Sequence, residues 1–116
     1  MTDTIFGKIL RGEIPADLVY EDEDCIAFPD ISPQAPVHLL VVPRKSIATL
    51  NDVQPEDAAL IGKLFLVAAR LAREAGIAQA GYRTIINCNA AAGQTVFHLH
   101  LHVLGGWPVQ PPSGGC

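Results

Sequence analysis

Residues 96–104 read Val-Phe-His-Leu-His-Leu-His-Val-Leu, and this stretch decides the fold class and points to the chemistry. Its polar and apolar side chains alternate with a period of two, which predicts a β-strand whose successive side chains lie on opposite faces. We therefore expect His98, His100 and His102 to share one face and the apolar residues between them to share the other. Because the unperturbed pKa of histidine lies near neutral, such a row can supply bases, nucleophiles or metal ligands.

Four other segments combine short apolar runs with flanking turn residues, so they are also predicted to be strands. They are residues 18–21, 25–28, 37–42 and 83–88. The first two flank the acidic stretch 22–24, which indicates a hairpin. Residues 29–36 hold three prolines and are predicted to form an ordered loop rather than a helix or a strand.

Two helices are predicted. A short one covers residues 4–11, with Asp3 or Thr4 as its N-cap and Gly12 after its end. A long one covers roughly residues 55–75 and has apolar residues at spacings of three and four. Its apolar surface is wider than a single stripe, so this helix is either deeply buried or also contacts a partner chain.

Five strands that mostly follow one another, with one long and one short helix, imply an α+β fold. We expect a five-stranded antiparallel sheet with the helices on one face. The chain has 116 residues and no repeat or internal linker, which suits one domain spanning residues 1–116. Its ends are expected to be a flexible N-terminus over about residues 1–3 and a Pro/Gly-rich tail over about residues 107–116.

The composition excludes several classes of protein. A net charge of -4 argues against a general nucleic-acid-binding surface, which would need a face rich in lysine and arginine. No apolar stretch approaches the roughly 18 residues of a membrane span. The cysteines, Cys25, Cys88 and Cys116, are odd in number and widely spaced, so neither a disulfide framework nor a cysteine zinc site is predicted. We expect a cytoplasmic protein.

Three interpretations of the histidine run compete. The first is an ordinary strand with histidines on its solvent face, although such positions usually hold Thr, Lys, Glu or Ser. The second is a zinc site, because histidines at i and i+2 lie roughly 6 to 7 Å apart along a strand and can share an ion. The first and third histidines lie about 13 Å apart, so zinc would leave one unexplained. Zinc is therefore possible but not favoured, and no cofactor is required.

The third interpretation is nucleophilic catalysis on phosphorus, and it explains the most residues. A neutral imidazole attacks well and leaves well, so it can split a displacement into two steps through a covalent intermediate. His100 is the only one of the three with a histidine on both sides. Just upstream, Gly93, Gln94 and Thr95 offer backbone N–H groups and a hydroxyl for an anion.

The same residues match a family. Residues 93–106, Gly-Gln-Thr-Val-Phe-His-Leu-His-Leu-His-Val-Leu-Gly-Gly, resemble the histidine triad (HIT) signature, His-x-His-x-His followed by apolar residues. Agreement continues upstream with Ile-Phe-Gly-Lys-Ile at 5–9, Glu-Ile-Pro at 13–15, Asp-Ile-Ser-Pro-Gln-Ala-Pro-Val-His at 30–38 and Val-Val-Pro at 41–43. Together these segments, which span about residues 4 to 106, resemble the Hint branch, the nucleoside phosphoramidases.

The resemblance implies a homodimer whose subunits each bind a purine nucleoside monophosphate group. The implied reaction is hydrolysis of the P–N bond of a purine nucleoside phosphoramidate, such as AMP joined to an amine. By position, His100 would attack the α-phosphorus and form a nucleotidyl-histidine that water then hydrolyses. His98 and His38 would orient the site, and His102 would contact the phosphate.

The resemblance also implies how substrate is held. Thr95 keeps the hydroxyl of a position that is commonly serine, Asn87 would lie near the ribose and phosphate, and Asp30 would accept hydrogen bonds from the ribose hydroxyls. The apolar slot for the base would consist of Ile5, Phe6, Phe28 and Ile31. The chain departs from the family pattern at Pro29, Ser46 and Trp107, and the tail that Trp107 begins often shapes leaving-group specificity in Hint proteins.

Each of these roles has a simpler alternative. Phe6 and Phe28 could be core residues, Asp30 could form only an Asx turn before the Pro-rich loop, and His38 could be a hydrogen-bonded core histidine. Asn87 could be a polar residue at a strand end. For the whole protein, the alternatives are a dinucleoside polyphosphate hydrolase or nucleotidyl transferase, and a non-enzymatic nucleotide- or zinc-binding regulatory module.

Overall fold

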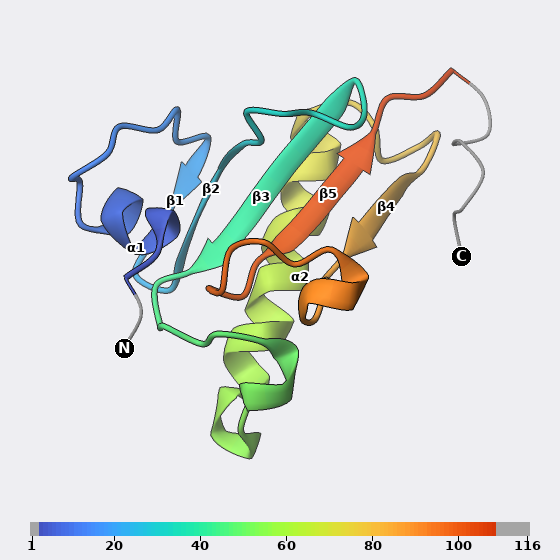
Figure 1. Ribbon diagram of the computed structural model, residues 1–116. Helices are drawn as coiled ribbons and strands as arrows, with labels where there is room; N and C mark the ends of the chain where they lie inside the picture. The colour runs from blue at the N-terminus through green and yellow to red at the C-terminus, as the bar shows by residue number, and fades with distance from the viewer. Residues whose placement is uncertain (1–2, 109–116) are drawn as a thin grey trace.

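Five strands form one sheet in the order β1-β2-β3-β5-β4, and every neighbouring pair is antiparallel (Figure 1). This computed structural model describes residues 3–108. The strands are β1 (Tyr20–Glu21), β2 (Cys25–Pro29), β3 (Val37–Pro43), β4 (Tyr82–Ile85) and β5 (Leu101–Gly105). The predicted α+β class, with one long and one short helix, is confirmed. The parts of the expected flexible N-terminus and tail at residues 1–2 and 109–116 lie outside the described residues.

The helices are α1 (Ile5–Leu10) and α2 (Ala58–Glu74). The described residues also contain three short 3-10 helices: η1 (Leu50–Asp52) and η2 (Pro55–Asp57) precede α2, and η3 (Ala90–Ala92) lies between β4 and β5. Thr4 is the N-cap of α1, because its hydroxyl accepts a hydrogen bond from the Gly7 N–H. In α2 the residues at spacings of three and four are buried against the sheet. No helix within residues 3–108 combines the length and apolarity needed to cross a membrane.

Side-chain alternation along the strands divides the core into two clusters on opposite faces of the sheet. On β2, Cys25 and Ala27 pack in the cluster that includes α2. Ile26 and Phe28, which alternate with them, pack in a second cluster with Phe6 of α1. The expectation that both helices cover one face is therefore wrong, since α1 lies on the face opposite α2. The cause is the near-continuous apolar sequence of β2 and β3, which needs cover on both sides.

The predicted strand over residues 96–104 is shorter in the structure, where β5 begins only at Leu101. In the β3–β5 register Val41 pairs with Leu101, so residue 99 would have to pair with Pro43, which has no N–H to donate. The Leu99 N–H instead bonds to the Ile47 carbonyl at 2.6 Å. His98 and His100 consequently lie in an irregular segment just before the strand, and only His102 lies on it.

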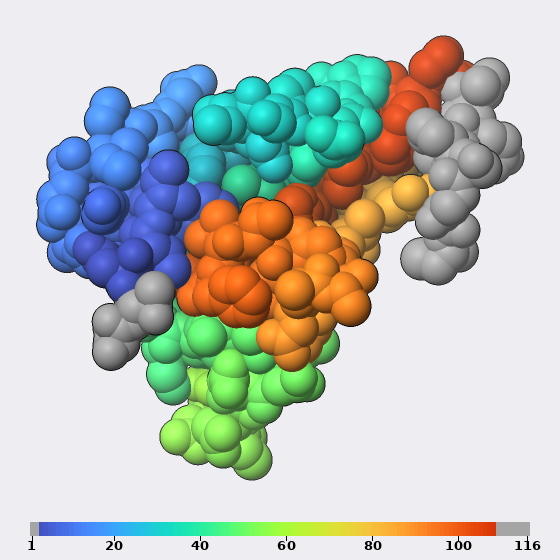
Figure 2. All heavy atoms as spheres, viewed as in Figure 1, coloured from blue at the N-terminus to red at the C-terminus, as the bar shows by residue number. Residues whose placement is uncertain are grey.

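Three segments far apart in the chain meet on the face that α1 covers. They are the N-terminal region around α1, the loop after β2, and the segment that precedes β5. In Figure 2 these appear in blue, cyan and orange around a hollow, inside which part of the sheet is visible. The fold thereby brings three segments that are far apart in the sequence to one surface depression.

Candidate active site

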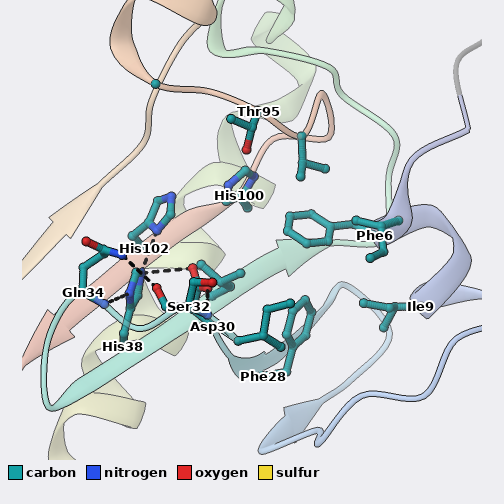
Figure 3. Close-up of a pocket in the computed structure, with 15 residues that line it drawn as sticks. Phe6, Ile9, Phe28, Asp30, Ser32, Gln34, His38, Thr95, His100 and His102 are labelled. Carbon is teal, nitrogen blue, oxygen red and sulfur yellow. Dashed lines mark hydrogen bonds and ion pairs between the residues drawn. The ribbon is translucent and has the colours of Figure 1, made fainter.

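A pocket of about 440 Å³ opens in this depression (Figure 3). Its volume is within the range of sites that hold small organic ligands. Of the residues predicted to form a site, ten line it: Ile5, Phe6, Phe28, Asp30, Ile31, His38, Gly93, Thr95, His100 and His102. The loop after β2 adds Ser32 and Gln34, which were not predicted to be site residues although both lie within the motif at residues 30–38.

His100 presents an unprotonated nitrogen to the pocket. Its Nδ1 lies 2.8 Å from the His98 main-chain oxygen, and because a carbonyl can only accept, Nδ1 carries the hydrogen. The Nε2 of the neutral ring therefore keeps its lone pair. Burial lowers the pKa of His100, which favours this neutral form. The Phe6 ring stands perpendicular to the imidazole, with ring centroids 4.9 Å apart, and restrains its orientation.

His102 and His38 form a pair beside the His100 ring. His38 Nε2 lies 2.9 Å from His102 Nδ1, and the centroids of His100 and His102 are 4.9 Å apart. The pKa of His102 is lowered to about 4 by burial and by the neighbouring His100 and His38. Burial likewise lowers the pKa of His38, against the opposing effect of Asp30. At neutral pH all three rings are uncharged.

Asp30 has two partners at the pocket wall. Its Oδ1 accepts a hydrogen bond from the Ser32 N–H at 2.8 Å, which is the Asx turn, and its Oδ2 lies 3.5 Å from His38 Nε2. The Asx-turn alternative and the pocket position are therefore both correct. Phe6 and Phe28 also have two roles, since their rings pack edge to face at 5.6 Å within the core and line the pocket as well.

Three predicted site residues do not line the pocket. His98 is buried with 3% exposure, and its Nε2 donates to the Pro43 carbonyl at 2.7 Å. His98 instead lines a smaller hollow beside α1, and its main-chain oxygen contacts His100. Asn87 is half-buried outside the pocket lining. Gln94 is buried and holds the loop after β4 together rather than facing a ligand.

The contacts of Gln94 tie the loop before β5 to neighbouring main-chain groups. Its Oε1 accepts from the Asn89 N–H at 2.7 Å, and its Nε2 donates to the carbonyls of Ala48 and Val96 at 2.9 and 3.0 Å. Gly93 adopts a left-handed conformation with φ 97°, which favours glycine. This clamp places Thr95, which is exposed, at the rim of the pocket near His100.

Within residues 3–108, one group of three side chains has the spacing of metal ligands, namely Asp30, His38 and His102. The Gln34 N–H donates to His38 Nδ1 at 3.0 Å, so that nitrogen already uses its lone pair. A neutral imidazole has one such lone pair, and a metal at Nε2 would need a second. This group fits a metal only if that hydrogen bond breaks or the ring loses its last N–H proton.

Comparison with known proteins gives this geometry a context. The HIT domain family matches residues 11–109. The chain is 51% identical over 109 residues to the purine nucleoside phosphoramidase of Escherichia coli K12, covering 94% of this chain and 92% of that protein. It is 54% identical over 112 residues to a HIT-like protein of Synechococcus elongatus, with 97% of both chains covered. A HIT family hydrolase from Legionella pneumophila superposes with a TM-score of 0.90 at 48% identity, over 95% of this chain and 98% of that one.

Proposed function

Because the chain belongs to the HIT family and is a hydrolase of that family, we propose that it cleaves the P–N bond of purine nucleoside phosphoramidates of the AMP-amine type. The observation that carries the proposal is the free lone pair of His100 Nε2 on the wall of a nucleotide-sized pocket. The identity to a purine nucleoside phosphoramidase supports the choice of substrate class.

In the proposed reaction the His100 Nε2 lone pair forms a bond to the α-phosphorus while the bond from phosphorus to the amine nitrogen breaks. The departing amine takes up a proton from solvent water and leaves, and the water that attacks in the second step returns a proton to solvent. Water then attacks the same phosphorus, the bond from phosphorus to Nε2 breaks, and the products are a nucleoside monophosphate and the neutral imidazole. A nucleophile that stays neutral at physiological pH supports both steps.

The pocket suits a nucleotide held mainly by neutral groups. Among the described residues that line it, none is lysine or arginine. We assign the phosphoryl oxygens to His102 and to the Thr95 hydroxyl, and the ribose hydroxyls to Asp30. The base would lie in the slot formed by Ile5, Phe6, Phe28 and Ile31.

The first test is the variant His100→Ala. Phosphoramidate turnover should fall by several orders of magnitude, because removing a nucleophile removes the covalent route, whereas AMP should still bind. Mass spectrometry of wild-type protein quenched during turnover should find the nucleotide on His100. An adduct on another residue, or turnover that survives the substitution, would rule out the proposed nucleophile.

The alternatives are separated by parallel measurements. A dinucleoside polyphosphate assay run beside the phosphoramidate assay ranks the two enzymatic activities, and equal or inverted rates would remove the first. A regulatory module would bind nucleotide without turnover. We further propose that no metal is required, given the Gln34 contact on His38, so turnover should persist in excess chelator.

A further inference from the structure

The loop between β2 and β3 contains a main-chain donor that the proposed reaction does not yet use. This donor is the N–H of Gln34, which lies 3.0 Å from His38 Nδ1. The loop around it is closed at its base by the hydrogen bond from the Asp30 N–H to the His38 carbonyl at 2.9 Å. Within it, the Gln34 side-chain amide donates to the Ser32 carbonyl at 3.0 Å. Figure 3 shows Gln34 and His38 side by side at the wall of the pocket.

The direction of each hydrogen bond follows from this donor. An amide N–H can only donate, so His38 Nδ1 accepts and the ring hydrogen of neutral His38 is on Nε2. That hydrogen faces His102 Nδ1 at 2.9 Å and Asp30 Oδ2 at 3.5 Å, both of which can accept it. In the opposite tautomer the hydrogen on Nδ1 would face the Gln34 N–H, and the lone pair on Nε2 would face the Asp30 carboxylate. His38 is thus fixed from both ends.

The same reasoning fixes His102. Because its Nδ1 accepts from His38, the hydrogen of the neutral ring must be on Nε2. The result is that His102 offers an N–H donor while its neighbour His100, whose Nδ1 is protonated, offers a lone pair. The two rings have opposite tautomers although their centroids are only 4.9 Å apart.

We propose that the main-chain N–H of Gln34 is a positioning group for the reaction: acting through His38, it makes His102 present an N–H, rather than a lone pair, to the phosphoryl group. This inference rests on the proposed function for its catalytic consequence. A donor aimed at a phosphoryl oxygen stabilises the charge that develops there, whereas a lone pair would repel it. Loss of one such donor typically lowers kcat by on the order of 10²-fold.

The proton positions can be read directly by ¹⁵N NMR of the ligand-free protein above the ordinary histidine pKa of 6.5. The chain has only four histidines, so each ring can be assigned. We expect His38, His98 and His102 to be protonated on Nε2 and His100 alone on Nδ1. A hydrogen on Nδ1 of His38 or of His102 would overturn the inference without any variant being made.

The catalytic consequence is tested by comparing Gln34→Pro, which removes the N–H, with Gln34→Ala, which keeps it and removes only the side-chain amide. Relative to Gln34→Ala, the proline variant should lose on the order of 10²-fold in kcat with a smaller change in KM, and His102 should show a mixture of tautomers. Equal kcat in the two folded variants would overturn the inference, and if the proline variant does not fold, the wild-type NMR spectrum decides.

Failure of the proposed function gives a different result. In that case the wild-type protein would not hydrolyse phosphoramidates, and no nucleotide adduct would form on His100, while the NMR tautomers would still be as stated. Conversely, an adduct on His100 together with Nδ1-protonated His102 would keep the proposed function and remove the role of Gln34.

Discussion

His98 and His100 lie two residues apart, yet only the second ring reaches the pocket. The difference arises because the segment before Leu101 is not a strand, so the regular alternation of faces does not apply to it. His98 instead ties the segment to the end of β3 through the Pro43 carbonyl. At the scale of single residues, the triad therefore divides into one anchoring ring and two rings that line the pocket.

This division predicts the effect of His98→Ala. The substitution leaves the buried Pro43 carbonyl without its donor and should lower the free energy of unfolding by about 1–3 kcal/mol. Denaturant unfolding measures this loss. Because the His98 main-chain oxygen remains in place for His100, turnover should fall far less than in His100→Ala. A loss of turnover as large as that of His100→Ala, in a folded protein, would show that the His98 ring acts on the substrate.

Two elements differ in how far they could be predicted. Helix α2 follows from apolar spacing together with Pro55 and Gly76, and the structure agrees to within a few residues. The start of β5 could not be predicted, because it depends on pairing opposite Pro43, and that register is a tertiary contact. The predicted position of α1, on the same face as α2, was wrong for a similar reason. The apolar pattern of a short helix does not indicate which face of the sheet Phe6 packs against.

At the same scale, most site residues could be predicted because they lie in short continuous motifs, such as residues 30–38. The family resemblance supplied their expected roles. The sequence could not show which side chains within a motif face the pocket. Gln94 lies between two pocket residues, Gly93 and Thr95, but its three hydrogen bonds turn it inward.

Gly93, in the loop before β5, and Gly62, in α2, allow a matched test of how backbone conformation affects stability. A Cβ added at Gly93 or at Gly62 would contact nothing within 4 Å, so only the backbone differs. Gly93 has φ 97°, and Gly93→Ala should destabilise the protein by about 1–2 kcal/mol. Gly62 lies inside α2, and Gly62→Ala should stabilise it by about 0.5–1 kcal/mol. Denaturant midpoints measure both, and shifts of the same sign would contradict the backbone argument.

For the whole molecule, the four histidines make stability depend on pH. All four have a pKa below the ordinary 6.5 in the folded state, chiefly because they are buried, and that of His102 is lowered to about 4. The unfolded chain therefore binds more protons than the folded one in this window. Stability should be complete above about pH 6.5 and should decline as the pH falls from 6.5 toward 4.

Denaturant unfolding at constant ionic strength across this window measures the effect. The carboxyl groups, whose usual pKa is 3.8 to 4.5, contribute mainly below about pH 5, so the upper part of the window reports on the histidines. His102→Gln removes the group with the lowest pKa among the histidines, so the variant should lose stability less steeply with acid. A flat profile for the wild-type protein between these limits would contradict the burial of the rings.

The outer face of α2 bears on assembly. Phe65 and Leu66 are 44% and 70% exposed, and we propose that this face joins two copies of the chain in the expected homodimer. Light scattering should give a dimer mass for the wild-type protein and a monomer mass for Leu66→Glu. Leu18→Glu changes an exposed leucine outside α2 and is the control. A wild-type monomer at micromolar concentration would remove the proposal.

The sheet order also constrains how the protein is made. Strand β5 is synthesised after the other four, yet it lies between β3 and β4 and joins them. On the ribosome, therefore, β4 has no neighbouring strand to pair with until the segment that carries His100 and His102 emerges. A nascent chain that has completed its sheet already contains both pocket-facing imidazoles of the triad. A chain that stalls earlier lacks β5, which joins β3 to β4, and lacks both of these imidazoles.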